Sequence, residues 1–166
     1  AGATHVNTTV NGLGERAGNA PLEEVVLGLK KLHGIETGVN LKGFPALSSQ
    51  VASASGRAVP WQKSVVGGGV FTHEAGIHVD GLLKHPDNYQ GFDPQEVGQS
   101  HRIVLGKHSG PRAVQVVYAG LGITLSDAEA QALLSSVRHF VAAHKHSPEM
   151  LDLHALLASV RSPLHV

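Results

Sequence analysis

The chain has 166 residues, of which 42% are hydrophobic, and its 13 acidic side chains balance 13 basic ones. A net charge of zero gives no basic surface for nucleic acid or for an acidic membrane. The absence of cysteine excludes disulfides and thiolate metal sites, and we expect a cytoplasmic protein. No apolar run approaches the roughly 20 residues of a membrane helix, so no membrane partner is expected.

The first predicted unit is a strand, a glycine-rich loop and a helix. His5–Val10 is rich in β-branched residues, which favour a strand, and Asn11–Asn19 contains three glycines. A helix is predicted to begin near Pro21 and to run to His33, with Gly34 ending it. One strand cannot form a sheet by itself, because its backbone groups stay unpaired on both sides. Since this unit follows Ala1 directly, we expect a carboxy-terminal piece of a larger protein.

The remainder of the chain is predicted to be mainly helical. Ser126 is expected to open a long helix, with Glu129 at the capping-box position three residues later. Two segments are predicted to be extended, Lys63–Phe71 and Arg102–Leu105. The predicted helices are Ala46–Ser55, Thr72–Lys84, Pro111–Tyr118, Ser126 to about His144, and Pro148–Val160.

Three stretches together resemble the homocitrate and isopropylmalate synthase family. They are Asn11–Ala20 (NGLGERAGNA), Phe71–Lys84 (FTHEAGIHVDGLLK) and Val97–Gly110, which ends in LGKHSG. Their order and separation also match that family. The second stretch most resembles the homocitrate synthases associated with nitrogen fixation, because isopropylmalate synthases more often have Gln-Asp-Gly where this chain has Val79-Asp80-Gly81.

The resemblance implies an α/β fragment, namely the last strand–helix unit of a TIM barrel followed by mainly α-helical carboxy-terminal subdomains. Residues 1–44 would be the terminal β-α unit, 45–110 a linker with the first helical subdomain, and 111–166 the second helical subdomain. Gly67-Gly68-Gly69 would form a hinge, a tight turn or both. The family's metal-binding aspartate and His-X-His pair belong to strands that would precede Ala1.

The resemblance also implies an acyltransferase that condenses acetyl-CoA with 2-oxoglutarate to give homocitrate and CoA. It implies a divalent metal ion of the Mg, Mn or Zn class, and a homodimer whose helical arm is swapped onto the partner. Because most metal ligands lie outside this sequence, we expect the isolated chain to be inactive. Two alternatives stay open: an isopropylmalate synthase that accepts 2-oxoisovalerate, and a non-catalytic helical dimerisation module.

The resemblance assigns roles to three residues. Asn19 maps to the metal, where an amide oxygen suits a hard cation, although its position also fits a helix N-cap. His78 maps to a catalytic residue that transfers a proton in the neighbouring subunit's active site. His101 stands where relatives carry an active-site tyrosine hydroxyl, although a surface histidine is an equal alternative. His73 and Glu74 stay ambiguous.

Two competing motif interpretations are weaker. Gly12-X-Gly14-X-X-X-Gly18 follows a predicted strand as a dinucleotide fingerprint does, but Glu15 would repel the pyrophosphate and no second parallel strand is evident. His73 and His78 are five residues apart, and on a regular helix that spacing puts them on different faces, which disfavours a shared metal.

Overall fold

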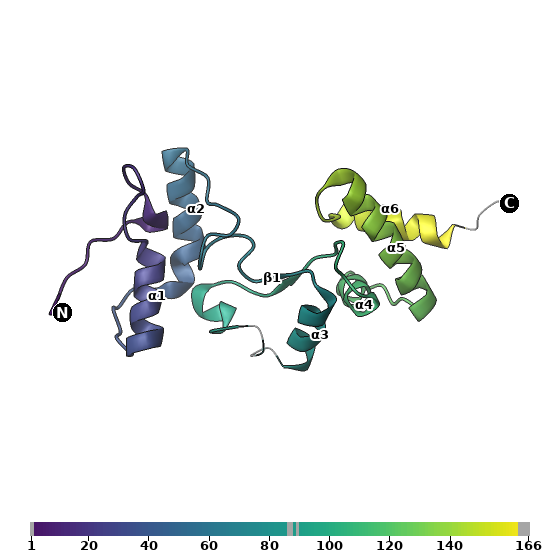
Figure 1. Cartoon of the computed structure of the whole chain (residues 1–166), viewed down its shortest axis with the longest axis horizontal. Coiled ribbons are helices and arrows are strands. Elements are labelled where there is room, and N and C mark those ends of the chain that lie inside the picture. The colour runs from purple at the N-terminus through teal and green to yellow at the C-terminus, as the bar shows by residue number, and fades with distance from the viewer. Residues whose placement is uncertain (1, 86–87, 89, 163–166) are drawn as a thin grey trace. The chain divides into compact units, whose positions relative to one another are not determined.

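The computed structural model describes residues 2–85, 88 and 90–162, and these form two compact units. One unit comprises Ala1–Phe71 and Phe92–Ser100, and the other comprises Thr72–Gly91 and His101–Val166. Figure 1 traces the chain through both. Each unit has its own buried apolar cluster.

The first unit is built on two helices, α1 (Leu22–His33) and α2 (Phe44–Ser55). Three short 3-10 helices accompany them: η1 (Val10–Gly12), η2 (Leu41–Gly43) and η4 (Pro94–Val97). Helix α1 begins with acidic and ends with basic side chains, which complements its dipole, and Gly34 ends it in the left-handed conformation as predicted. The buried cluster of this unit contains Val26, Leu27, Leu41, Phe44, Val65 and Val97.

In the described part of the second unit there are four α-helices and one pair of parallel strands. The helices are α3 (Gly76–Lys84), α4 (Pro111–Gly120), α5 (Asp127–His144) and α6 (Met150–Arg161). Strand β1 (Thr72–His73) pairs with β2 (Arg102–Ile103), with Thr72 opposite Arg102 and His73 opposite Ile103. Apolar residues from α3, α4, α5 and α6 form one buried cluster, together with Leu105 and Leu125.

Two details of the helical unit follow from its sequence. The predicted capping box is confirmed: Ser126 Oγ accepts the Glu129 amide hydrogen, and the Ser126 amide donates to Glu129 Oε2 at 2.8 Å. The Tyr118 hydroxyl, buried between helices, donates to the Leu153 carbonyl at 2.8 Å. Burial raises the pKa of Tyr118 to about 12, so the ring stays neutral.

The predicted strand His5–Val10 is wrong. Residues 2–8 have no regular structure, Thr9 makes one isolated bridge to Pro21, and a 3-10 helix begins at Val10. The physical reason is the lack of a neighbouring strand. In the described part of the chain no other strand lies alongside this segment, so its backbone groups have no strand to pair with.

The predicted extended segment Lys63–Phe71 is also wrong, because it forms consecutive turns. The Gly67 amide donates to the Lys63 carbonyl at 2.8 Å, and the Gly69 amide donates to the Trp61 carbonyl at 2.9 Å. A Cβ atom on Gly69 would lie 2.3 Å from the Trp61 indole nitrogen. The glycines therefore allow the chain to fold closely against this ring.

The remaining boundaries differ from the predictions by small shifts. The helix predicted from Thr72 begins only at Gly76, because Thr72 and His73 pair with β2 instead. Helix α2 begins two residues before Ala46, and α6 begins two residues after Pro148, where Glu149 and Asp152 form a second capping box. The predicted extended segment Arg102–Leu105 is confirmed for its first two residues.

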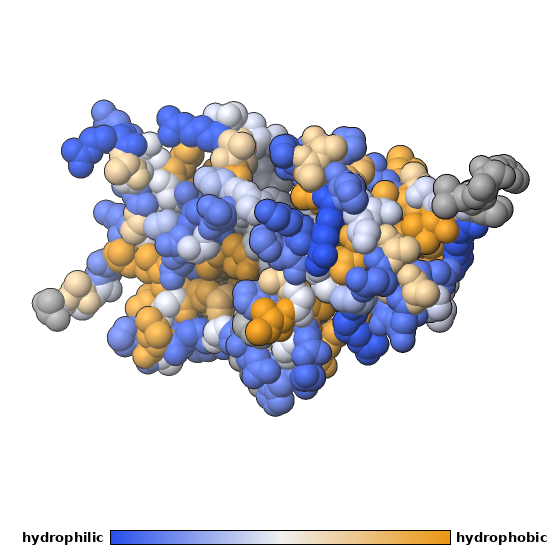
Figure 2. All heavy atoms as spheres, turned by 45° about the vertical axis from the view of Figure 1, so that its right-hand side comes forward, coloured by the Kyte–Doolittle hydropathy of each residue, from blue (hydrophilic) through white to orange (hydrophobic). Residues whose placement is uncertain are grey.

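Hydrophobic side chains lie among hydrophilic ones on the molecular face drawn in Figure 2. None of the helices in the described part of the chain combines the length and apolarity that crossing a membrane requires. Large exposed apolar side chains include Leu32, Ile35, Val39, Trp61, Ile77 and Leu151.

Glycine substitutions test the geometry of the loop before α1. Gly18 has φ +83°, and a Cβ atom there would lie 2.2 Å from the Gly12 carbonyl oxygen. We expect Gly18→Ala to lower the free energy of unfolding by about 1–3 kcal/mol, measured by denaturant titration. The control is Gly28→Ala within α1, where no atom lies within 4 Å of the added Cβ; it should stabilise by roughly 0.5–1 kcal/mol. Equal effects from the two variants would contradict this loop conformation.

Candidate functional site

Asn19 lies at the end of the loop and turns its side chain back into it. Its backbone amide donates to the Gly12 carbonyl at 3.0 Å, and its Nδ2 donates to the Leu13 carbonyl at 3.1 Å. Gly14 permits this, because a Cβ atom there would lie 2.3 Å from Asn19 Nδ2. Since the amide nitrogen is used within the loop, the chemistry left to Asn19 is that of its Oδ1, a hard oxygen donor.

The alternative role of Asn19 as a helix N-cap is wrong. Pro21 occupies the N-cap position of α1, and no side chain there bonds the first helical amides. Proline presets an extended backbone at that point, so the helix begins without a polar cap. Asn19 therefore serves its own loop and not α1.

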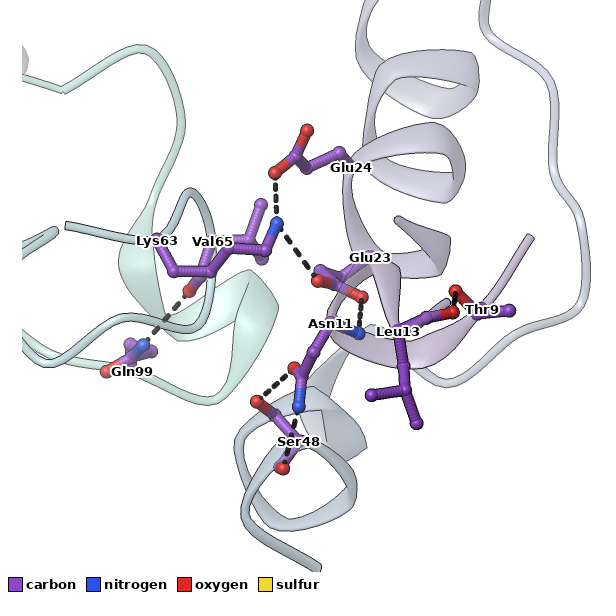
Figure 3. Close-up of polar contacts among 9 residues, drawn as sticks. All are labelled: Thr9, Asn11, Leu13, Glu23, Glu24, Ser48, Lys63, Val65 and Gln99. Atoms are coloured by element: carbon purple, nitrogen blue, oxygen red, sulfur yellow. Dashed lines mark hydrogen bonds and ion pairs between the residues drawn. The ribbon is translucent and has the colours of Figure 1, made fainter. Parts of the chain in front are cut away.

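Asn11 anchors the start of the same loop. It has φ +60°, which is uncommon for a residue with a side chain. Its backbone amide donates to Glu23 Oε2 at 3.2 Å, and its Nδ2 donates to the Ser48 carbonyl at 3.0 Å, while the Ser48 hydroxyl donates to Asn11 Oδ1 (Figure 3). The Thr9 hydroxyl donates to the Leu13 carbonyl at 2.7 Å. These bonds tie the loop to α1 and α2.

A buried ion pair lies behind the loop. Glu23 is only 1% exposed, and its Oε1 lies 3.2 Å from Lys63 Nζ, whose side chain is 13% exposed. Lys63 also contacts the carboxylate of Glu24, and all three side chains meet in Figure 3. A buried carboxylate is stable only when it is paired and hydrogen-bonded, and Lys63 and the Asn11 amide supply those partners. Sequence reasoning missed this pairing, because an acidic residue in a first helical turn suggests only a favourable dipole interaction.

A cleft opens beside the loop. Arg57, two residues beyond the end of α2, is one of its lining residues, and its guanidinium donates to the Gly14 carbonyl at 3.1 Å. The cleft is lined by residues 11–14, 16–18, 51, 55 and 57–60, including Arg16 and Ser55. The loop that bears Asn19 therefore borders a concave surface within its own unit.

Asn19 Oδ1 has the chemistry of a hard oxygen ligand for a divalent metal ion. Within residues 2–85, 88 and 90–162, no three histidine, aspartate or glutamate side chains lie together as a metal-binding group would require. The described residues therefore contain no complete metal site built from such side chains.

In the second unit, the second and third motifs fold against each other. The Val104 amide donates to the His73 carbonyl, the Gly76 amide donates to the His108 carbonyl, and the His108 amide donates to Glu74 Oε1, each at 3.0 Å. We call this pair of segments, residues 73–76 and 104–110, the motif clamp. It joins two stretches that lie about thirty residues apart in the sequence.

Ser109 and Gly106 complete the motif clamp. The buried Ser109 hydroxyl accepts the Gly106 amide hydrogen at 2.9 Å and donates to the Glu74 carbonyl at 3.1 Å. Gly106 leaves room for the Glu74 carboxyl group, which a Cβ atom there would meet at 2.3 Å. Arg138 on α5 donates to the Ser109 carbonyl at 3.2 Å. Glycine and serine of the LGKHSG stretch thus serve the packing of this unit.

The motif clamp brings His73 next to His101. Nε2 of His73 lies 3.0 Å from Nδ1 of His101, and Nε2 of His101 lies 2.9 Å from Oε1 of Gln90. We call these three residues the histidine array. His73 is buried in β1, His101 is half-buried, and His78 is exposed on α3. His73 and Gln90 were not assigned from sequence, because the contacts join residues far apart in the chain.

Burial lowers the pKa of His73, and the repulsion that a protonated His73 would meet from a protonated His101 or His78 lowers it further. His73 is therefore neutral at physiological pH. A folded-state pKa below the ordinary value of 6.5 means that the unfolded chain binds the proton more readily. The contribution of His73 to stability is complete above pH 6.5 and is lost as the pH falls through its folded-state pKa.

The sequence of the chain matches two family models and several known synthases. Residues 1–51 match the HMGL-like family model, and residues 65–145 match the model described as homocitrate synthase post-HMGL domain-like. The 2-isopropylmalate synthase 2 of Caldanaerobacter subterraneus subsp. tengcongensis is 53% identical over 138 residues, which cover 83% of this chain and 36% of that protein. The homocitrate synthase 1 of Nostoc sp. is 47% identical over 156 residues, covering 92% of this chain and 41% of that protein. The (R)-citramalate synthase CimA of Methanocaldococcus jannaschii is 41% identical over 163 residues, covering 98% of this chain and 33% of that protein.

The chain belongs to the homocitrate and isopropylmalate synthase family. The predicted fold class is confirmed, with an HMGL-like barrel fragment followed by a helical region. The chain spans 33–41% of the length of these three relatives. Because the relatives include three kinds of synthase, the assignment to one member of the family stays a prediction. The dinucleotide fingerprint is not supported, since no strand precedes its loop in the described structure.

Removing the charge of Glu23 tests the buried ion pair. We expect Glu23→Gln to lower the free energy of unfolding by roughly 1–3 kcal/mol, because Lys63 loses its most buried partner and the Asn11 amide loses a charged acceptor. Glu24→Gln is the matched control, since its carboxylate is 39% exposed; it should cost less than about 1 kcal/mol. Denaturant titrations measure the free energy of unfolding of both variants. A larger loss for Glu24→Gln than for Glu23→Gln would show that Glu23 is not the more important partner of Lys63.

Proposed function

We propose that the chain is part of a homocitrate synthase of the type associated with nitrogen fixation. The intact enzyme would condense acetyl-CoA with 2-oxoglutarate and release homocitrate and CoA. The observation that carries this proposal is the histidine array, in which residues of the family motifs contact each other. The same unit bears the exposed His78. The wording of residues 79–81 and the 47% identity to the Nostoc homocitrate synthase 1 support the choice of substrate.

The residues of this chain would have three tasks in that reaction. Asn19 would offer its Oδ1 to the divalent metal, which supplies Lewis-acid polarisation of the keto group when it is bound. His78 would accept a proton from the methyl carbon of acetyl-CoA, a task that suits an exposed imidazole. His101 would supply an N–H donor to a developing oxygen charge.

The rest of the catalytic machinery would come from elsewhere. A homodimer whose helical arm is swapped onto the partner would let His78 act beside the partner's metal. Residues 1–44 would complete the barrel of their own subunit. This arrangement would make the isolated chain inactive, and it would operate in the cytoplasm.

An isopropylmalate synthase is the second candidate. The 53% identity to the Caldanaerobacter protein supports it, and its acceptor would be 2-oxoisovalerate. A non-catalytic helical dimerisation module is a third candidate for the isolated chain, since the metal-binding group would be incomplete within it.

The acceptor preference of the intact protein tests the proposed function. We expect kcat/KM to be highest with 2-oxoglutarate, measured as CoA thiol release from acetyl-CoA in the presence of a divalent metal. Parallel assays with 2-oxoisovalerate and pyruvate complete the panel. The 166-residue chain alone is the control and should release no CoA with any acceptor. A higher kcat/KM with 2-oxoisovalerate would move the assignment to isopropylmalate synthase.

His78→Ala in the intact protein tests the catalytic role of that residue. Loss of a general acid–base group should lower kcat by ~10²–10⁴-fold, while the affinities for metal and oxo acid stay close to those of the parent. The control is His139→Ala, an exposed histidine on α5 that should leave kcat unchanged. Mixing His78→Ala chains with chains that lack a metal ligand should restore activity if the arm is swapped. Unchanged kcat in His78→Ala would remove His78 from the mechanism.

A further inference from the structure

Hydrogen-bonding chemistry fixes the direction of each bond in the histidine array. Gln90 presents a carbonyl oxygen, Oε1, to Nε2 of His101, so this nitrogen must carry a hydrogen. Neutral imidazole has one N–H donor and one acceptor nitrogen, which leaves Nδ1 of His101 as the acceptor. Nε2 of His73, 3.0 Å away, must then be the donor. The array thus runs in one direction, from His73 through His101 to Gln90.

We propose that His73 is a positioning residue that holds His101 in the tautomer with its hydrogen on Nε2. By occupying Nδ1 of His101, the His73 N–H keeps the opposite nitrogen in the donor form. Gln90 Oε1, which accepts the hydrogen of His101 Nε2, is an uncharged carbonyl oxygen. A carbonyl oxygen of a bound substrate has the same chemistry and could take the place of Gln90 Oε1. This inference rests on the proposed function, in which His101 donates a hydrogen bond in the reaction.

The surroundings of His73 suit this role. Strand pairing with β2 fixes its backbone, since the His73 carbonyl accepts the Val104 amide hydrogen and His73 lies opposite Ile103. The side chain is 9% exposed, so solvent does not compete freely for its N–H. Burial also keeps the His73 ring neutral at physiological pH, so it has one N–H donor to offer. A single imidazole held in this way orients its partner as the outer-shell residues of other active sites do.

Two substitutions in the intact protein separate positioning from packing. His73→Leu fills the buried space without a donor, whereas the side-chain amide nitrogen of His73→Gln has the reach to replace Nε2. We expect His73→Leu to lower kcat by about 10–100-fold with little change in the KM for oxo acid, and His73→Gln to recover most of the loss. His139→Leu is the control and should match the parent. Equal kcat losses in His73→Leu and His73→Gln, or no loss in either, would overturn the proposal.

A spectroscopic measurement on the 166-residue chain makes the test independent of activity. Long-range ¹H–¹⁵N correlation spectra distinguish the two neutral histidine tautomers by their ring nitrogen shifts. We expect His101 to be protonated on Nε2 in the parent and in His73→Gln, and to be a mixture in His73→Leu. Protonation of His101 on Nδ1 in the parent would overturn the proposal. If the tautomer result holds while His78→Ala leaves the intact protein fully active, the proposed function fails and the inference about His101 stands.

Discussion

The motif clamp is the constraint on which the second unit depends. Two backbone–backbone hydrogen bonds join residues 73–76 to residues 104–110, and two more bonds run from the His108 amide to the Glu74 carboxylate and from the Ser109 hydroxyl to the Glu74 carbonyl. Each of these groups would otherwise be an unpaired polar group near a packed core. Val79 and Leu105 continue directly from the two segments into the apolar cluster of α4 and α5. The same contacts fix His73 and begin α3, so the geometry of the histidines follows from the folding of the motifs.

In the first unit, a buried ion pair stabilises the loop before α1. Its loop has positive φ at Asn11, Gly12, Arg16 and Gly18, and such a backbone needs external support. The Glu23 carboxylate provides that support by accepting the Asn11 amide hydrogen while Lys63 balances its charge. Asn19 bonds the Gly12 and Leu13 carbonyls, which directly follow Asn11, so the ion pair supports the loop segment that holds Asn19. A buried pair of this kind is costly to break on one side, which makes the loop conformation sensitive to either partner.

Local signals predicted the helices well. Terminal charges and Gly34 predicted α1, Pro111 predicted the start of α4, and the Ser126–Glu129 box predicted α5, because each signal acts within a few residues. The strand at His5–Val10 failed because strand formation requires a neighbour, which the sequence pattern does not contain. Strand β1 was missed for the opposite reason, since its partner lies thirty residues away.

The candidate site residues show the same contrast between local sequence signals and contacts made by distant residues. The motif wording placed His78 and His101 among the candidates, but only folding shows that His101 contacts His73 and Gln90. In the proposed tautomer, His101 would present an N–H donor where the family resemblance implies a tyrosine hydroxyl. No local pattern reports such a contact, since its three residues come from three separate stretches of the chain.

Native-state amide hydrogen exchange on the 166-residue chain tests most directly whether the motif clamp organises the second unit. The amides of Gly76, Val104 and His108 donate within the motif clamp, although two of them lie outside regular helices. The account predicts that these three amides exchange only with the cooperative opening of the core, with the same opening free energy as Val114 and Val137 in α4 and α5. Exchange at the rate of an exposed loop, while α4 and α5 stay protected, would contradict it.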